Sequence, residues 1–343
     1  QAEEGIRYSV ASRGLGDVYK RQGGTIDKLE SIKGFNCSLN PQQMQDQVAE
    51  IGCCIAAQNA AIAPADGLLY AIRDVTNTID SIPLITASII SKKAAEGLGS
   101  LVLDVKCGQG AFMQSFGDAE ALAKSMVGAA QGLGIKAIAQ ITQMDYPIGR
   151  YIGNSLEILG SIAVLKGQGS SDTRELVVLQ GAALLVLSGV ASDEFTGQAM
   201  MNNVLDNGEA LAKFKQMCLA QGVSQPDVEL LITEPTKLLA NSKQITSIES
   251  TSQGYVSAIT SMTLAEIARN HGAGRFAMED TIIPEIGFEI LVERGQAINQ
   301  GETWIKFHHN IDLTAQEKQA LTESIIISSK PIEAKPRLIE IIR

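Results

Sequence analysis

The sequence predicts a soluble globular protein of the α/β class, built on a parallel βαβ unit and ending in a smaller α+β subdomain. The stretches SLVLDVKC (100–107) and KAIAQITQM (136–144) have the apolar patterns of strands. Between them, GDAEALAKSMVGAAQGLG (117–134) has the pattern of a helix with Asp118 as its N-cap and glycines at its end. A strand, a helix and a strand within about 45 residues are typical of a parallel βαβ unit.

Length, charge and cysteine content narrow the possible class of protein. The 343 residues are enough for one large or two ordinary domains. A formal charge of −10, with 28 basic against 38 acidic residues, argues against a nucleic acid or an anionic membrane as partner. The longest apolar stretch, 176–190, is shorter than the roughly 20 residues of a membrane span. Five cysteines without metal-type spacing predict reduced thiols and a cytoplasmic protein.

The N-terminal quarter is the least regular part of the sequence. Residues 1–22 have neither an initiator Met nor an apolar signal segment, and we interpret them as a non-native leader. One good helix is predicted near QQMQDQVAEIG. Asp66 is expected to cap a helix over 67–74, and Ser81 with Pro83 to begin another that runs to Gly97. Such short helices need packing partners, and no segment upstream of them is predicted to supply any.

The remainder divides into a helical and a strand-rich part. Residues 153–222 are predicted to be mostly helical, including a helix over 207–222. After about residue 243 the segments 245–260, 282–298 and 302–311 favour strands, with a short helix at TLAEIARN. This part is the predicted C-terminal α+β subdomain.

Two short stretches carry side chains suited to one kind of ligand. Ile85, Ser88 and Lys92 are spaced i, i+3 and i+7 on one helix face, and Tyr70 and Arg73 lie one turn apart. A flat heterocycle with carbonyl oxygens suits this set, because Arg and Lys donate to carbonyls, Ser binds a ring edge and Ile covers a ring face. The same spacing also fits an ordinary amphipathic helix with a solvated Lys.

Longer stretches carry a resemblance to a known family. They are GGTIDKLESIKGFN (23–36), APADGLLYAIRDVTNTIDSIPLITASIISKKAAEGL (63–98), LVLDVKCGQGAF (101–112) and MDYPIGRYIGNSLEI (144–158). Together they closely resemble the thymidine phosphorylase and pyrimidine-nucleoside phosphorylase family. The match runs from Gly23 to about the C-terminus and is strongest over 23–158.

This resemblance implies a pentosyltransferase that uses inorganic phosphate as co-substrate and needs no cofactor. It also implies a cytoplasmic homodimer. Arg73 and Lys92 are expected to be catalytic, because they would stabilise the negative charge on the departing pyrimidine. The family's base-contacting residues correspond to Tyr70, Arg73, Ser88 and Lys92. Its apolar residues that cover the base correspond to Ile85 and Phe112, and its phosphate-contacting Thr corresponds to Thr25.

The implied architecture is a large mixed α/β domain, a small all-α domain that binds the base, and the C-terminal α+β subdomain. The expected limits are 1–22 for the leader, 23–64 and 96–242 for the α/β phosphate and sugar domain, 65–95 for the remnant of the all-α domain, and 243–343 for the C-terminal subdomain.

The sequence also departs from the family pattern. The Lys-His-Ser-Thr-Gly-Gly loop, which holds phosphate and provides a proposed proton donor, has no counterpart here, nor do the first helices of the all-α domain. We therefore expect a truncated sequence with impaired activity. The position of the family's cation-binding Glu is occupied by Gly160, and adjacent His308 and His309 would point to opposite faces of a strand, so no metal is expected.

Three functions remain open at this point. The first is phosphorolysis of thymidine or deoxyuridine to the free base and 2-deoxy-D-ribose 1-phosphate, in pyrimidine nucleoside salvage. The second is a broader pyrimidine-nucleoside phosphorylase that accepts uridine. The third is a catalytically inactive relative that binds a base or has a regulatory role.

Overall fold

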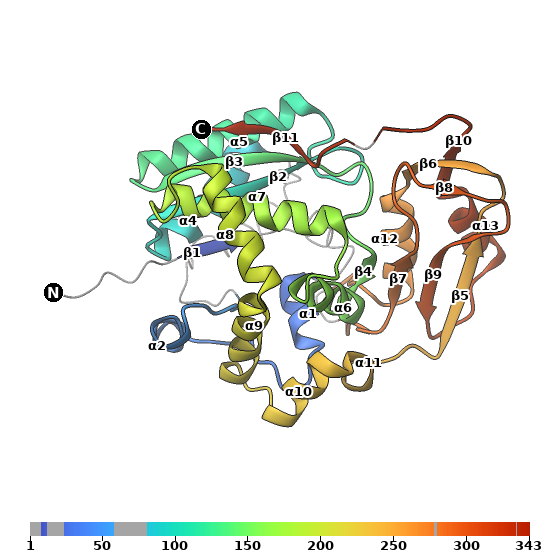
Figure 1. The fold of residues 1–343 in the computed structure, drawn as a ribbon, viewed down its shortest axis with the longest axis horizontal. Helices are drawn as coiled ribbons and strands as arrows, with labels where there is room; N and C mark the ends of the chain where they lie inside the picture. Colours follow the sequence, from blue (N-terminus) through green and yellow to red (C-terminus); the bar gives the residue numbers. More distant parts are fainter. Residues whose placement is uncertain (1–7, 12–23, 58–80, 278–279, 334) are drawn as a thin grey trace.

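The computed structural model describes residues 8–11, 24–57, 81–277, 280–333 and 335–343. The α/β part of the chain and the strand-rich C-terminal part lie beside each other (Figure 1). Four strands form the main sheet, in the order β1 (Tyr8–Ala11), β2 (Ser100–Cys107), β3 (Lys136–Gln143) and β11 (Leu338–Ile342). The first three strands are parallel, and β11 is antiparallel to β3.

The predicted βαβ unit is confirmed as β2, α5 (Phe116–Gly132) and β3. Alternate side chains of β2 face opposite layers. Leu101 and Leu103 pack with α5 and with α4 (Ile82–Ala95), whereas Val102 packs with Leu184 of α7 (Ser171–Leu187). Because helices cover both faces, every position of the strand is buried or half-buried.

The start of α5 differs from the sequence prediction. Asp118 is not the N-cap, because the helix begins at Phe116 and Ser115 caps it. Ser115 Oγ accepts the backbone N–H of Asp118 at 3.2 Å and donates to its carboxylate at 2.7 Å. Asp118 thus stabilises the first turn from inside the helix.

Helix α4 has its packing partner downstream in the sequence. Its buried Ile90 joins the cluster formed by β2, β3 and α5. The Thr86 hydroxyl lies 2.8 Å from that of Ser125 on α5. Helix α4 therefore packs on the main sheet's outer helix instead of on segments upstream of it.

A second helical layer surrounds a separate core, in which Ile32, Cys218 and Leu231 are fully buried. Among the described residues, the other helices of the α/β part are α1 (Thr25–Glu30), α2 (Pro41–Ile51), α6 (Asn154–Leu165), α8 (Glu194–Asp206), α9 (Glu209–Ala220), α10 (Gln225–Thr233) and α11 (Pro235–Leu238). None of the helices within the described ranges is long and apolar enough to cross a bilayer.

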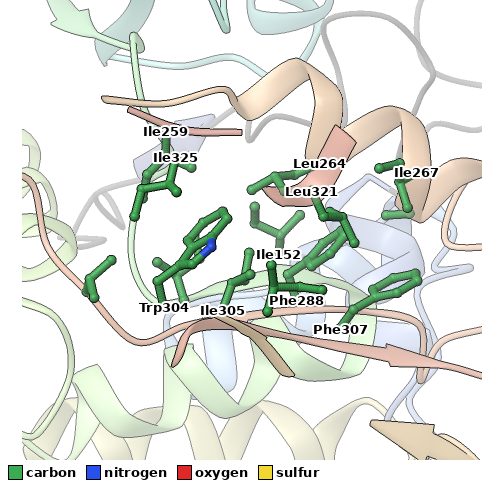
Figure 2. Close-up of a cluster of buried hydrophobic side chains, with 14 of the residues drawn as sticks. Ile152, Ile259, Leu264, Ile267, Phe288, Trp304, Ile305, Phe307, Leu321 and Ile325 are labelled. Atoms are coloured by element: carbon green, nitrogen blue, oxygen red, sulfur yellow. The ribbon is translucent and has the colours of Figure 1, made fainter. Parts of the chain in front are cut away.

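The C-terminal part contains two antiparallel sheets around one aromatic core. Trp304, Phe288 and Phe307 are fully buried in it, and the last two rings stack with centroids 4.4 Å apart (Figure 2). One sheet has the order β4 (Tyr151–Gly153), β7 (Gly287–Ile290), β9 (Thr303–His309) and β5 (Gln244–Glu249). The other has the order β10 (Ile325–Ser328), β6 (Gly254–Ile259) and β8 (Ala297–Ile298). Helices α12 (Ser261–Asn270) and α13 (Ala315–Glu323) pack on them.

Each part contributes one strand to a sheet of the other part. Strand β4 comes directly after β3 in the sequence but pairs with β7 of the C-terminal part. Strand β11 comes after the strands of the C-terminal part but pairs with β3 of the main sheet. At the first crossing, Gly153 lies opposite Gly287, where an added Cβ on Gly287 would be 2.1 Å from the Ile152 carbonyl oxygen. Only glycine fits that approach.

Candidate active site

Helix α4 places three of the predicted base-binding residues on one face. It begins after Ser81, with Pro83 in its first turn, as the sequence predicted. Ser88 is buried, and half-buried Lys92 donates from Nζ to Ser88 Oγ at 3.2 Å one turn later. Two polar groups from successive turns of the helix therefore meet at one point.

The apolar members of the predicted set lie in the core cluster next to this face. Ile85 of α4 and Phe112 of the loop after β2 are both partly buried against it. Gly110 shapes that loop: its N–H donates to the Met144 carbonyl at 2.8 Å, and an added Cβ would be 2.7 Å from the same oxygen. The loop then returns to form a bridge between Cys107 and Met113. Ile85 and Phe112 thus border the same hydrophobic cluster.

Thr25, the predicted phosphate contact, lies on a different element. It is the exposed first residue of α1, whose Ile26 and Leu29 pack in the helical core. The carboxylate of Asp27 accepts the Gly24 N–H at 2.8 Å and thereby fixes the turn before the helix. Ser88 and Lys92 therefore lie on a helix that packs with the main sheet, whereas Thr25 lies on a helix of the separate helical core.

Arg275 holds the Thr25 turn from the C-terminal part. Its Nη2 donates to Asp27 at 2.7 Å, and this hydrogen bond raises the pKa of the guanidinium. The backbone of the same segment is tied by Asp280, which accepts the N–H groups of Phe276 and Ala277, each at 2.8 Å. Nothing in the sequence indicated that this segment reaches α1. Tyr70 and Arg73 lie outside the described residues.

A buried charged network at the carboxyl ends of β2 and β3 was not predicted. Lys106 lies 2.6 Å from the Asp104 carboxylate and donates to Thr142 at 3.0 Å, while Gln180 of α7 donates to Asp104 at 2.7 Å. Burial lowers the pKa of Lys106, although the charge of Asp104 opposes this effect. Carboxyl ends of parallel strands are where α/β proteins bind ligands. The sequence did contain a signal for this network: Asp104 and Lys106 lie two residues apart in a strand, so their side chains must share one face.

The histidines have structural partners in the C-terminal part. His309 Nε2 lies 2.7 Å from Thr246 Oγ1, while His308 Nδ1 lies 3.4 Å from Ser242 Oγ. His271 ends α12 and is buried, with Nε2 3.1 Å from a Glu317 carboxylate oxygen. Across the described part of the chain, no group of three His, Cys, Asp or Glu residues is placed to hold a metal ion.

Both parts of the chain resemble known protein families. Residues 11–211 match the glycosyl transferase family a/b domain, and residues 255–328 match the pyrimidine nucleoside phosphorylase C-terminal domain. The thymidine phosphorylase of Rattus norvegicus is 40% identical over 339 residues, which cover 97% of this chain and 70% of that protein. The thymidine phosphorylase of Homo sapiens is 40% identical over 332 residues, covering 95% and 68%. The pyrimidine-nucleoside phosphorylase of Geobacillus stearothermophilus is 39% identical over 330 residues, covering 96% and 74%.

Proposed function

The chain belongs to the family of thymidine phosphorylases and pyrimidine-nucleoside phosphorylases, and we propose that it transfers the pentose of thymidine or deoxyuridine to inorganic phosphate. The products are the free pyrimidine and 2-deoxy-D-ribose 1-phosphate. The observation that supports this proposal most directly is the meeting of Ser88 and Lys92 on the face of α4 that also carries Ile85.

The reaction explains why a cation is needed there. When the glycosidic bond breaks, the pyrimidine departs with negative charge while the sugar gains oxocarbenium character. Lys92 at a ring carbonyl stabilises that anion more than the neutral base, and this difference is what accelerates the reaction. Ser88 orients the ammonium group through the 3.2 Å hydrogen bond and can bind the ring edge. Ile85 and Phe112 cover the ring and exclude water.

Three further residues belong to the proposed site. Arg73 is the second donor to the leaving base, and Tyr70 contacts the ring beside it. Thr25 binds phosphate from the turn that Asp27 fixes. Inorganic phosphate is the co-substrate, and we propose no cofactor. Homodimer formation and a cytoplasmic location stay predictions from the family resemblance.

A broader activity on uridine is the second candidate. All the proposed contacts on α4 are made with the base, and none of them distinguishes a ribose from a deoxyribose. Phosphate-dependent base release should be compared for thymidine, deoxyuridine and uridine. A thymidine phosphorylase should prefer the two deoxynucleosides over uridine, whereas the broader enzyme should also accept uridine.

The decisive test compares neighbouring lysines of one helix. Lys92→Ala should lower phosphate-dependent thymine release by about 10²–10³-fold, the typical loss for one preorganised donor. Lys93→Ala is the matched control, because Lys93 pairs with Glu96 at 3.1 Å and has no proposed role in the reaction. It should change turnover only a few-fold. Equal rates for the two variants would contradict the assignment. Thymine binding by a wild-type chain that releases no base would instead identify an inactive base-binding relative.

A further inference from the structure

A cavity of about 150 Å³ lies between the α/β part and the C-terminal part. One wall is the segment after β3, residues 146–150, together with the start of α7. The opposite wall comes from β6 and from the residues after β7. Lys335 and Arg337, which precede β11, complete the lining. We call this space the Arg337 cavity. None of the described residues assigned to the proposed nucleoside site lines it.

The Arg337 cavity is positively charged. Four cationic and two anionic side chains line it, which leaves an excess of two positive charges. They are Arg150, Arg294, Lys335 and Arg337 against Asp172 and Glu293. The Asp172 carboxylate is already engaged, because it accepts from Arg337 Nη2 at 2.6 Å and from the Gly149 N–H at 3.2 Å. The exposed Arg150 and Lys335 lie on the solvent side.

Two of these arginines have a buried donor with no partner within the described ranges. Arg337 is 1% exposed, and its Nη1 and Nη2 are fully used, whereas its Nε has no acceptor. Arg294 donates from Nε to the Ser257 carbonyl at 3.0 Å, but its buried Nη1 has no acceptor. Buried donors are rarely left unpaired in folded proteins. Both orphaned donors belong to side chains that line the same cavity, so one acceptor-rich ligand could satisfy both.

The start of α7 adds a third source of positive potential. Ser170, Ser171 and Asp172 line the cavity, and Ser170 precedes the helix without capping it through its side chain. The first turn of this 17-residue helix, with the positive end of its dipole, therefore borders the cavity. Anions bind well at such positions when other donors converge on them.

Size and donor geometry identify the class of ligand. An engineered protein cavity of about 150 Å³ accommodates benzene, which has one heavy atom more than phosphate. Guanidinium groups match phosphate oxygens with paired, charge-assisted hydrogen bonds. We propose that the Arg337 cavity binds a phosphate group, held by Arg294, Arg337 and the N-terminus of α7, at a site separate from that of the co-substrate phosphate.

The proposed ligand would connect the two parts of the chain. Arg294 belongs to the C-terminal part, whereas α7 covers the main sheet. A bound phosphate group would therefore stabilise their contact and protect the folded state in proportion to its concentration. Free phosphate and the phosphate of a small phosphorylated sugar share this chemistry.

The test follows the arginine side chains directly by NMR, through their Nε–Hε signals. Inorganic phosphate should shift the signals of Arg294 and Arg337 saturably, whereas chloride at equal ionic strength should not. Arg294→Gln should weaken the affinity reported by the Arg337 signal by about tenfold or more, as expected for a lost charged hydrogen bond. Arg343→Gln is the matched control, because Arg343 is exposed and pairs with Glu194 on the surface. It should leave the affinity unchanged.

The outcomes separate this proposal from the proposed enzyme. Thr25→Ala should weaken phosphate-dependent base release but leave the Arg337 titration intact. Tighter binding of ribose 5-phosphate than of inorganic phosphate identifies a phosphorylated sugar as the ligand, and the reverse order identifies free phosphate. Shifts that do not saturate, that chloride reproduces, or that persist unchanged in Arg294→Gln overturn the proposal. Arg294→Lys keeps this test valid if Arg294→Gln does not fold, because it retains the charge but loses the planar paired donors, and it should also weaken the affinity.

Discussion

Replacing Arg337 with Leu should destabilise the folded chain severely. The guanidinium is 1% exposed and lies 3.7 Å above the Tyr146 ring. Besides pairing with the Asp172 carboxylate, it donates to three backbone carbonyls. They belong to Gln143, Tyr146 and Pro147. Removing one member of a buried ion pair costs about 3–5 kcal/mol, because the other charge stays buried without compensation.

Chemical denaturation measures this effect. With a cost of about 4 kcal/mol, the midpoint of thermal unfolding should also fall, by about 6 °C for a chain of 343 residues. The double variant Arg337→Leu/Asp172→Asn should recover part of the loss, because it no longer buries an unpaired carboxylate. Arg343→Leu is the surface control, since its pair with Glu194 is exposed and worth about 0–1 kcal/mol. A single-variant cost below about 1 kcal/mol, or strictly additive substitutions, would refute the reasoning.

The pH dependence provides an independent check of the same pair. Burial raises the pKa of Asp172, but the Arg337 charge and the Gly149 N–H outweigh it and hold that pKa below its usual value. In the wild type the stabilisation is present above the unfolded-state pKa, which is about 3.9, and is lost as the pH falls toward the folded-state pKa. In Arg337→Leu only the hydrogen bonds from the Gly149 N–H and from Ser170 still oppose burial, so the pKa of Asp172 rises and less stability is lost on its protonation. The difference in unfolding free energy between the two proteins should therefore shrink in acid.

Two further predictions concern the C-terminal part. Gly287→Ala should destabilise by several kcal/mol or prevent folding, because its Cβ would lie 2.1 Å from the Ile152 carbonyl oxygen. Gly99→Ala is the matched control, because nothing lies within 4 Å of its added Cβ and its φ, like that of Gly287, is not positive. Burial lowers the pKa of His308, so the unfolded state binds more protons below about pH 6.5 and stability falls there by at most about 1.4 kcal/mol per pH unit. Denaturant titrations at pH 7.5 and 5.5 test this, and an equal loss in His308→Gln contradicts it.

The elements that the sequence predicted well are those with local signals. Alternating apolar residues and flanking glycines identified β2, α5 and β3, and Ser81 with Pro83 marked the start of α4. The N-cap of α5 was misassigned by three residues, because Ser115 and Asp118 both favour that position. The spacing of Ile85, Ser88 and Lys92 correctly predicted one shared helix face, because helical periodicity is also local.

What could not be predicted depends on contacts between distant segments. No local pattern indicates that α4 packs on α5, that β11 pairs with β3, or that Arg275 reaches Asp27. The burial of Arg337 is the clearest case. Its sequence neighbours include several charged residues, and an arginine in such a segment is normally solvated. Its burial depends on Asp172 and on carbonyls that lie far away in the sequence.

The pairing of β11 with β3 also bears on how the chain folds during synthesis. A ribosome releases β2, α5 and β3 early, yet the hydrogen-bonding edge of β3 stays open until every residue of the C-terminal part has emerged. An exposed strand edge is a template for pairing with other chains. Pairs between distant strands also form slowly, because a long loop must close first. The nascent α/β part therefore passes through a long period with an uncovered edge, in which chaperones could bind it and another copy of the chain could occupy the place of β11.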